Sequence, residues 1–509
     1  MSYFHKLKDK IHRKILLLKL KHLTKKLDFK IIMGLVLAIV LVLTTIVVAL
    51  KSSSAIINTG IKTIVNIAGE ELKTDSNNNT NFMMLGTGGK NHEGSNLTDS
   101  LIIASLDNDT KEITMLSIPR DLYIKNADLG SYKINEAFYR GTKQAPYETA
   151  KIEFGIKNIE KNIEDLMGIE VHYWAKINFE GLVQLIDEVG GVDVYVDETI
   201  YDPTYPKDGT FAFEAFRINK GEQHIDGATA LKYARSRHTT SDFDRAKRQQ
   251  KILTAFKDKA LKKEVLLSVS KLTDLINVLG ENIQTNMEIK EMITLAGIVK
   301  DTNKDKIYSK VLHDDPRYCG GLLYTPSREY YGGMFILLPA GGQEFIQKYM
   351  GLIFNYQTAL NKRPKLQILN SSGTVGAATN TMQILKRFCF NTYRYGNGKD
   401  SMQEFTTYYY ATKKDETGKI TTPEPAIIKA LQSVIPGKVS TDIPEEYIDY
   451  LYPNETQAQF ENSDIILELG KDYTESFNYI QDPYYTLPDV KAYTANEPED
   501  TVENSEAAE

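Results

Sequence analysis

A run of twenty residues without any charged side chain, Ile31–Leu50 (IIMGLVLAIVLVLTTIVVAL), constrains the architecture of this chain most strongly. At about 1.5 Å rise per residue, a helix of this length is roughly 30 Å long, which matches the apolar core of a bilayer. The thirty residues before it contain ten Lys and Arg against two Asp. Because basic flanks stay on the cytoplasmic side, we predict a basic cytoplasmic segment at 1–30, one transmembrane helix at 31–50 and export of the remainder.

Two other interpretations of this N-terminal region are weaker. A cleaved signal peptide has a shorter apolar run followed by a small-x-small cleavage site, and neither feature is present here. Binding of nucleic acid by the basic segment is the second alternative. The adjacent span already accounts for the basic charge, so we expect a membrane anchor and no nucleic-acid partner.

The charge and the cysteine content limit the function of the exported part. Beyond residue 30 the chain has 51 basic and 65 acidic residues, a net charge of −14. Any site for an anion must therefore be a local basic pocket. Two cysteines, Cys319 and Cys389, are too few for a disulfide framework. One bridge is compatible with export, but we expect none because the two cysteines fall in different predicted domains.

Short β-branched and apolar runs alternate with helical patterns along the exported part, which predicts an α/β sandwich. Gly190-Gly191 ends one of the predicted helices. The predicted strands are 82–85, 101–106, 113–118 and 192–196, with a helix at 179–189. We divide the chain into a stalk at 51–80 whose end overlaps the polar run 74–81, a main domain at 81–355, a linker at 356–364, a small α/β domain at 365–473 and an acidic, disordered tail at 474–509.

The main domain carries a cluster of arginines within LKYARSRHTTSDFDRAKRQQ, residues 231–250. We predict a helix from about Ala228 with Asp226 as its N-cap, and a second helix from near Asp242 to about Lys263. The arginines of this cluster are Arg235, Arg237, Arg245 and Arg248. Arginine presents a planar fork of donors that meets phosphate oxygens two at a time, so this pattern indicates a site for a phosphorylated ligand.

Further polar residues occur at the ends of predicted strands, where α/β proteins commonly bind ligands. They are Asp99, Arg120, Asp121, Lys133 and Asn135. Each also has an ordinary structural explanation, such as a turn, a surface ion pair or a solvated helix face. The combination favours a site, because the sequence contains no competing His/Cys ligand array, nucleophile elbow or Walker loop, and the GTGG at 86–89 is too weak a signal.

These motifs, in this order, resemble the LytR–CpsA–Psr family over about residues 81–355. The matching segments are Asp99, IPRD, KIN, NFEGLVQLIDEVGGVDV, GEQHIDGATALKYARSRH and SDFDRAKRQQ. The segment from 365 to 473, opening with LQILNSSGTVGAA, resembles the LytR C-terminal accessory domain. The resemblance implies a single-pass protein of the bacterial cell membrane with extracytoplasmic domains. It also implies a phosphotransferase that moves a glycopolymer from a polyprenyl-diphosphate carrier to a peptidoglycan acceptor.

The resemblance also assigns roles to individual residues. Pyrophosphate-binding residues fall on Arg120, Arg235, Arg237, Arg245 and Gln249. Asp99 falls on a carboxylate that binds Mg²⁺, and Asp242 on an acidic residue important for activity. We take Asp99, Arg120, Asp121, Arg237 and Asp242 as the candidate catalytic residues. Phosphoryl transfer depends on holding the phosphates and neutralising their charge, which suits this set; the base remains open among Asp99, Asp121 and Asp242.

Two departures from the family pattern affect the expected metal site. The family usually has Asp in an L-G-x-D pattern where this chain has Gly88, and usually has Arg where this chain has Leu97. The metal site is then weakened, lost or rebuilt from His92 or Glu93. The alternatives to an enzyme are a non-catalytic binder or scaffold for lipid-linked envelope intermediates, which Gly88 favours, and a cell-envelope regulator.

Overall fold

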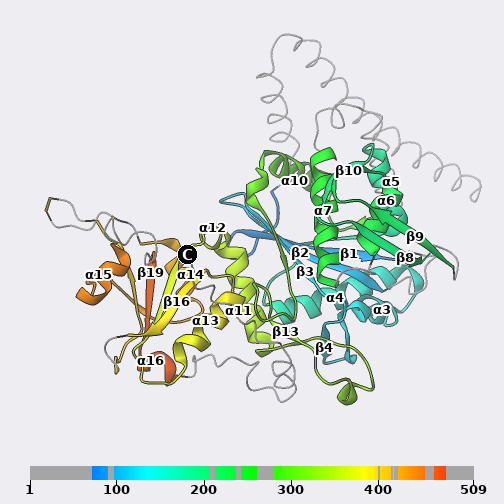
Figure 1. Cartoon of the computed structure of the whole chain (residues 1–509). Helices are drawn as coiled ribbons and strands as arrows, with labels where there is room; N and C mark the ends of the chain where they lie inside the picture. The colour runs from blue at the N-terminus through cyan, green and yellow to red at the C-terminus, as the bar shows by residue number, and fades with distance from the viewer. Residues whose placement is uncertain are drawn as a thin grey trace, which may run out of the picture.

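The computed structural model describes residues 71–89, 97–206, 212–236, 242–260, 280, 282–398, 402–413, 416–417, 422, 424–452 and 463–476. These residues form two lobes, with the N-terminal strands in one and the last strands in the other (Figure 1). Within the described ranges no helix has the length and apolarity needed to cross a bilayer. The predicted segment 1–30, the predicted span 31–50 and the tail beyond 476 lie outside these ranges.

The larger lobe is built on a six-stranded mixed sheet with the order β11-β6-β1-β2-β3-β12. The strands β1, β2 and β3 are antiparallel neighbours, while β6 runs parallel to β1 and β12 runs parallel to β3. Their bounds are β1 Asn79–Thr87, β2 Thr98–Asp107, β3 Ile113–Ile118, β6 Tyr173–Asn178, β11 Ile283–Thr285 and β12 Ile307–Val311. The three strands predicted between 82 and 118 are confirmed.

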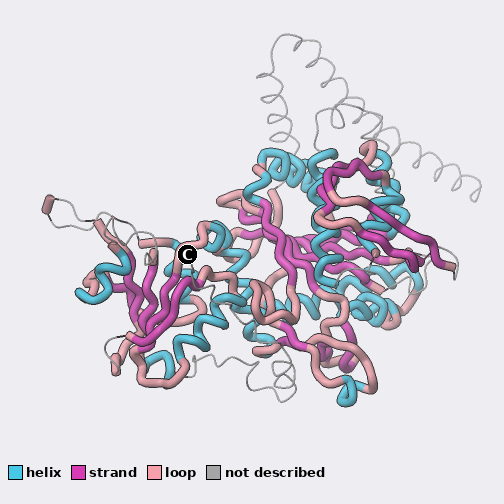
Figure 2. Tube along the Cα trace, in the orientation of Figure 1, coloured by secondary structure: helices cyan, strands magenta, loops and turns pink. Residues whose placement is uncertain are grey.

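Helices cover both faces of this sheet, because the side chains of β2 alternate between two apolar clusters. Leu101 and Ile103 belong to the main core with the apolar face of α4 (Lys151–Met167). Ile102 and Ala104 form a second cluster, against which Leu253 of α7 (Asp242–Ala260) packs. Figure 2 shows the strands as a layer between helices. The predicted α/β sandwich is confirmed.

Smaller elements complete the lobe and carry several predicted features. Asp226 caps α6 by accepting a hydrogen bond from the Thr229 N–H at 2.8 Å, as predicted. The strand predicted at 192–196 is present as β7. The remaining bounds are β4 Tyr123–Asn126, β5 Gly130–Lys133, η1 Ile134–Glu136, α3 Ala137–Thr142, η2 Glu148–Ala150, α5 Phe179–Glu188, β7 Val192–Val196, β8 Ile200–Pro206, β9 Phe213–Ile218, β10 Gly221–Ile225, α6 Gly227–Arg235, α10 Ile289–Asp301, η3 Lys304–Lys306, β13 Leu323–Tyr324, η4 Arg328–Tyr331 and β14 Leu338–Pro339.

The smaller lobe is the predicted second α/β domain, with a five-stranded sheet in the order β16-β15-β19-β17-β18. The domain opens with the strand β15, which is followed after a turn by the helix α13. Tyr408, Tyr409 and Tyr410 are buried in β17, so this run is an ordinary core strand. The bounds are β15 Leu366–Asn370, α13 Ala377–Arg387, β16 Thr392–Asn397, β17 Thr407–Tyr410, α14 Ala426–Gln432, β18 Lys438–Ser440, α15 Glu445–Leu451, β19 Ile465–Leu469 and α16 Lys471–Thr474.

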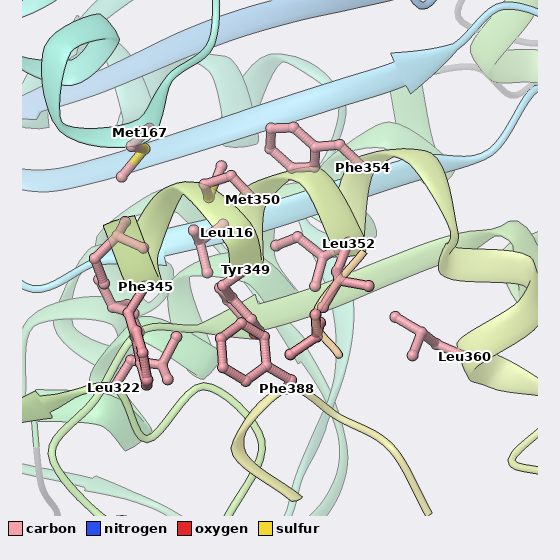
Figure 3. Close-up of a cluster of buried hydrophobic side chains, with 14 of the residues drawn as sticks. Leu116, Met167, Leu322, Phe345, Tyr349, Met350, Leu352, Phe354, Leu360 and Phe388 are labelled. Atoms are coloured by element: carbon pink, nitrogen blue, oxygen red, sulfur yellow. The ribbon is translucent and has the colours of Figure 1, made fainter. Parts of the chain in front are cut away.

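The two lobes share one continuous apolar core, which α11 (Gly342–Asn355) joins. The ring of Phe388 from the smaller lobe lies 5.5 Å from the ring of Phe345 and 6.3 Å from that of Tyr349, both on α11 (Figure 3). The linker predicted at 356–364 contains the short helix α12 (Gln357–Asn361), in which Leu360 is buried. The connection is therefore packed against the core along part of its length.

The prediction about the two cysteines is wrong, because Cys319 and Cys389 form a disulfide between the lobes. Two hydrogen bonds beside it fix the same junction. The Gly320 N–H donates to the Arg387 carbonyl at 2.9 Å, and Arg387 Nε donates to the Pro316 carbonyl at 3.0 Å. Assignment to different domains was a poor argument against a bridge, since the domains are packed together at this point.

The predicted boundary between the stalk and the main domain lies two residues too late, because β1 begins at Asn79. The polar residues Asn79, Thr80 and Asn81 belong to β1 and are buried. Hydrogen bonds compensate their burial: Thr80 Oγ1 donates to the Lys73 carbonyl at 2.8 Å and Asn81 Nδ2 to the Glu170 carbonyl at 2.9 Å. A polar stretch can therefore begin a central strand where each side chain finds a partner.

Candidate functional site

Four predicted polar residues from three segments form one chain of ionic contacts. Lys133 Nζ lies 2.7 Å from Asp121 Oδ1, and Arg120 Nε lies 3.3 Å from Asp121 Oδ2. Arg120 Nη1 then lies 3.2 Å from Asp99 Oδ1. The side chain of Asp121 is 8% exposed and that of Asp99 33%, so the chain runs from the interior to the surface. The structure thus brings these predicted residues together.

Backbone geometry at the end of β3 explains how these segments meet. Pro119 follows β3, and the Leu122 N–H donates to its carbonyl at 3.1 Å, which turns the chain at Arg120. The β4–β5 hairpin then returns the chain, so that the Asn135 N–H reaches the Arg120 carbonyl at 3.3 Å. Thr98 Oγ1 also donates to the Asn135 carbonyl, at 3.1 Å, which ties the start of β2 to the same corner.

The first turns of α7 complete a small pocket at this corner of the sheet. Arg245 and Gln249, one turn apart on α7, line the pocket together with Asp99 and with Pro119, the residue before Arg120. Arg245 is 6% exposed as a whole residue. The N-terminal end of a helix favours negative charge, so α7 adds to the attraction that Arg245 exerts on an anion here.

Arg235 reaches the region from the last turn of α6. Its guanidinium stacks on two aromatic rings, 4.3 Å from the centroid of Phe179 and 5.4 Å from that of Tyr205. Its Nη1 donates to the Tyr205 hydroxyl at 3.1 Å. Gln249 Nε2 lies 3.5 Å from the carbonyl of Ala234, the preceding residue. The supporting role of Phe179 and Tyr205 was not predicted, because spacing along the chain gives no signal for it.

Arg248, a further arginine of the cluster, binds the protein backbone. Its Nε donates to the Tyr233 carbonyl at 2.8 Å, and its Nη2 donates to the Ser236 carbonyl. Burial lowers the pKa of Arg248 from its usual value. Arg248 therefore fixes the end of α6, from which the chain continues towards Arg237.

Some of the predicted site residues cannot be placed. Arg237 lies outside the described residues, as does His238 beside it. Asp242 is the first residue of α7, but the described part of the structure does not extend to its side chain. Their proposed roles therefore stay predictions from the family resemblance.

The donor set fits Mg²⁺ only with help from a ligand. Within the described ranges, no group of three or more His, Cys, Asp or Glu side chains is placed to hold a metal. Asp99 supplies a carboxylate at the pocket, and Mg²⁺ is commonly held by one or two carboxylates together with phosphate oxygens and water. The residues present therefore suit a magnesium ion shared with a phosphorylated ligand.

The two departures from the family pattern lie at one place in the fold. Thr87 pairs with Thr98 at the end of the β1–β2 ladder, so the next residues along the two strands are Gly88 and Leu97. The acidic and the basic residue that the family usually has are therefore both replaced, at neighbouring positions of the fold. The predicted substitutes, His92 and Glu93, lie outside the described residues.

Comparison with known families shows to which family the chain belongs. The sequence model of the LytR_cpsA_psr family matches residues 42–331, more than half of the chain. The chain belongs to the LytR–CpsA–Psr family. A second model, described as LytR cell envelope-related transcriptional attenuator, matches residues 363–473 and so coincides with the smaller lobe. Both resemblances stated from the motifs are confirmed.

Several characterised members of the LytR–CpsA–Psr family are similar to part of the chain. The polyisoprenyl-teichoic acid–peptidoglycan teichoic acid transferase TagV of Bacillus subtilis is 31% identical over 239 residues, 46% of this chain and 55% of that protein. The cell wall biosynthesis protein LcpA of Corynebacterium glutamicum is 28% identical over 236 residues, 43% of each chain. The chain spans about half the length of the curated relatives it matches.

A further relative has a different kind of name, and one solved structure is similar to part of the chain. The Biofilm regulatory protein A of Streptococcus mutans is 34% identical over 197 residues, 38% of this chain and 45% of that protein. The crystal structure of B. subtilis TagV covers 55% of this chain and 99% of its own, with 24% identity and a TM-score of 0.43.

Proposed function

We propose that this LytR–CpsA–Psr protein is a membrane-anchored phosphotransferase that moves a glycopolymer from a polyprenyl-diphosphate carrier to peptidoglycan. The observation that carries the proposal is the corner formed by Asp99, Arg120, Arg245 and Gln249. Arg245, the Asp99 carboxylate and the first turns of α7 surround one small pocket, and Arg120 is paired with Asp99 at its edge. The named activities of the TagV transferase and related proteins support the same reaction class.

Two cations near the pocket are held in place before a ligand arrives, which suits this corner of the sheet to a diphosphate. Asp121 and Asp99 hold the guanidinium of Arg120, and the two aromatic rings hold that of Arg235. Arginines that are already oriented need little rearrangement when charge develops on a transferring phosphoryl group. Arg120, Arg235, Arg245 and Gln249, with Arg237 from outside the described residues, would bind the two phosphates.

In the proposed reaction, a hydroxyl oxygen of peptidoglycan attacks the phosphorus that carries the glycopolymer. A new P–O bond forms, the bond to the oxygen bridging the two phosphates breaks, and polyprenyl monophosphate leaves with that electron pair. The hydroxyl proton passes to a carboxylate. Asp121 already holds Lys133 and Arg120, so we assign it to positioning and keep Asp99 and Asp242 as candidate bases.

A magnesium ion and the membrane complete the proposal. Asp99 would hold Mg²⁺ jointly with the phosphate oxygens, and the ion would neutralise charge on the leaving phosphate. The segment at 31–50 would anchor the protein with its N-terminus in the cytoplasm and both lobes outside. A membrane tether raises the effective concentration of the pocket near a lipid-linked substrate.

A transfer assay with the full chain in detergent tests the proposal. Polyprenyl-diphosphate oligosaccharide, soluble peptidoglycan strands and Mg²⁺ are mixed with the protein, and the products are followed by mass spectrometry. We expect a phosphodiester-linked product and polyprenyl monophosphate, both dependent on Arg245. Binding of the lipid diphosphate without either product, whichever divalent cation is supplied, would reject the enzyme.

That same negative result would support the second candidate, a non-catalytic binder of lipid-linked intermediates. The observation that favours it is the absence of an acidic side chain at Gly88, beside the start of β2. A Gly88→Asp variant separates the two candidates further. Gain of transfer on restoring the carboxylate would identify this chain as a binding-only relative.

A further inference from the structure

An open groove of about 1010 Å³ lies on the flank of α7 opposite to the arginine pocket. Lys247, Lys251 and Thr254 of α7 line it at helical spacing. Arg245 and Gln249 point to the other flank because they are offset from those residues around the helix. Val311 at the end of β12 lines both cavities, so they adjoin there.

The second wall of the groove comes from β7, whose side chains alternate between core and surface. Val192, Val194 and Val196 are buried, which places Asp193 and Tyr195 on the surface facing the groove. Lys251 fixes the distance between this wall and α7. Its Nζ donates to the Tyr195 carbonyl at 3.1 Å and to Asp197 Oδ2 at 2.6 Å.

The third wall is the loop after β12, which the smaller lobe holds in place. His313 Nε2 lies 3.0 Å from the Cys319 carbonyl, and its Nδ1 accepts from the Asp315 N–H at 3.2 Å. Cys319 lines the groove and is bonded to Cys389 of the smaller lobe. Tyr318, next to that disulfide, is 61% exposed.

The chemistry of the lining suits a sugar chain that carries peptides. Tyr195, 50% exposed, and Tyr318 offer flat apolar rings with a hydroxyl at the wet end, on which a sugar ring stacks. Gln250 is buried at the groove, and its Oε1 has no hydrogen-bond partner among the described residues. The charged lining residues are Asp193, Asp197, Glu222, Asp244, Asp258 and Asp315 with Lys247, Lys251, Lys304 and Lys310.

We propose that this groove binds the peptidoglycan strand that accepts the glycopolymer. The inference rests on the proposed function, which requires an acceptor beside the diphosphate pocket. Because Val311 lines both cavities, a strand bound in the groove would lie next to that pocket. The excess of carboxylates repels a polymer rich in phosphate, whereas peptide stems with both amines and carboxylates match the mixed lining.

The groove also gives the accessory domain a role in acceptor binding. One wall is covalently bonded to that domain through Cys319, and the Gly320 N–H donates to the Arg387 carbonyl beside it at 2.9 Å. The domain would then act by holding the wall that carries Tyr318.

Binding of soluble, uncross-linked peptidoglycan strands to the full chain in detergent, measured by calorimetry, tests the groove. Tyr195→Ala and Tyr318→Ala should each weaken binding about fivefold, since an aromatic contact contributes about 1 kcal/mol. Tyr201→Ala and Tyr147→Ala are matched controls, because these tyrosines are 50% and 65% exposed on the same lobe away from the groove. The controls should bind as the wild type does.

The outcomes separate this inference from the proposed function. Peptidoglycan binding that depends on Tyr195 and Tyr318 supports the groove even if no transfer is detected, in which case only the proposed function fails. Transfer that proceeds while all four variants bind equally well overturns the groove and leaves the transferase intact. Equal losses in the groove and control variants would also overturn it, because stacking at the groove would not be the cause.

Discussion

The two flanks of α7 present opposite environments to solvent. On one flank, Arg245 is almost fully buried in a narrow pocket beside Asp99 and the start of the helix. On the other, the side chain of Lys247 is 65% exposed over a wide groove with more carboxylates than amines. Arg245 and Lys247, two positions apart on α7, thus face different sites. The first lines the arginine pocket, and the second lines a groove in which carboxylates outnumber lysines. One helix can therefore bind two substrates of different charge at adjoining surfaces.

The largest expected effect follows from Arg245→Ala, in the narrow pocket on the first flank of α7. Loss of one oriented donor to a transferring phosphoryl group costs about 10²–10³ in rate. We expect transfer to fall by that factor while peptidoglycan binding stays within twofold. Arg217→Ala is the control, since Arg217 is an exposed arginine of β9 on the same lobe. Comparable losses in the two variants would show that general positive charge, rather than the pocket, binds the lipid diphosphate.

Removal of the disulfide should weaken the groove on the other flank of α7, because Cys319 lines that groove. Replacing both Cys319 and Cys389 by Ser opens a link between residues separated by 70 positions, which typically lowers stability by about 3 kcal/mol. We expect a lower midpoint of thermal unfolding and weaker peptidoglycan binding, with lipid-diphosphate binding retained. Reductant should have the same effect on the wild type and none on the variant. A variant that loses more of its lipid-diphosphate binding than of its peptidoglycan binding would contradict the assignment of the two substrates to different flanks of α7.

A smaller loss of stability is expected from Arg248→Met. The variant keeps the length of the side chain but leaves the carbonyls of Tyr233 and Ser236 without their donor, at a cost of about 2 kcal/mol. Chemical denaturation measures the loss, with Arg217→Met as the matched control. Transfer should fall less than with Arg245→Ala. A stable variant with fully abolished transfer would instead make Arg248 a ligand of the diphosphate.

The smallest effect is a pH dependence at the groove wall. Burial lowers the pKa of His313 below its ordinary value of 6.5. The unfolded chain therefore takes up a proton first as the pH falls below 6.5, and the folded wall loses stability there. This stability is fully present above pH 6.5, and its slope is at most about 1.4 kcal/mol per pH unit. Unfolding measured between pH 5 and 8 should show this slope in the wild type but not in His313→Gln. An unchanged slope in the variant would assign it to another group.

The sequence predicted those features that depend on local pattern. Alternating apolar runs placed β1, β2 and β3, and the Asp226 cap and the acidic start of α7 placed the two helices around the arginine cluster. The motifs also identified Asp99, Arg120 and Arg245 as neighbours in space. These predictions succeeded because strand ends and helix starts converge at fixed places in an α/β fold.

Features that depend on tertiary packing could not be predicted. Arg248 looked equivalent to Arg245 by spacing, yet it binds backbone carbonyls because it points towards the end of α6. The disulfide depends on how α11 and Phe388 bring the lobes together. The groove combines β7, α7 and a loop more than fifty residues further along the chain, and no local pattern links them.

The most direct test compares Arg245→Ala and Tyr195→Ala in two binding measurements on the same preparations, one with polyprenyl-diphosphate oligosaccharide and one with soluble peptidoglycan strands. The proposed arrangement predicts that Arg245→Ala loses the lipid diphosphate and keeps the strand, while Tyr195→Ala does the reverse. If Arg245→Ala binds the lipid diphosphate as tightly as the wild type, the narrow flank of α7 is not the diphosphate site and the account is wrong.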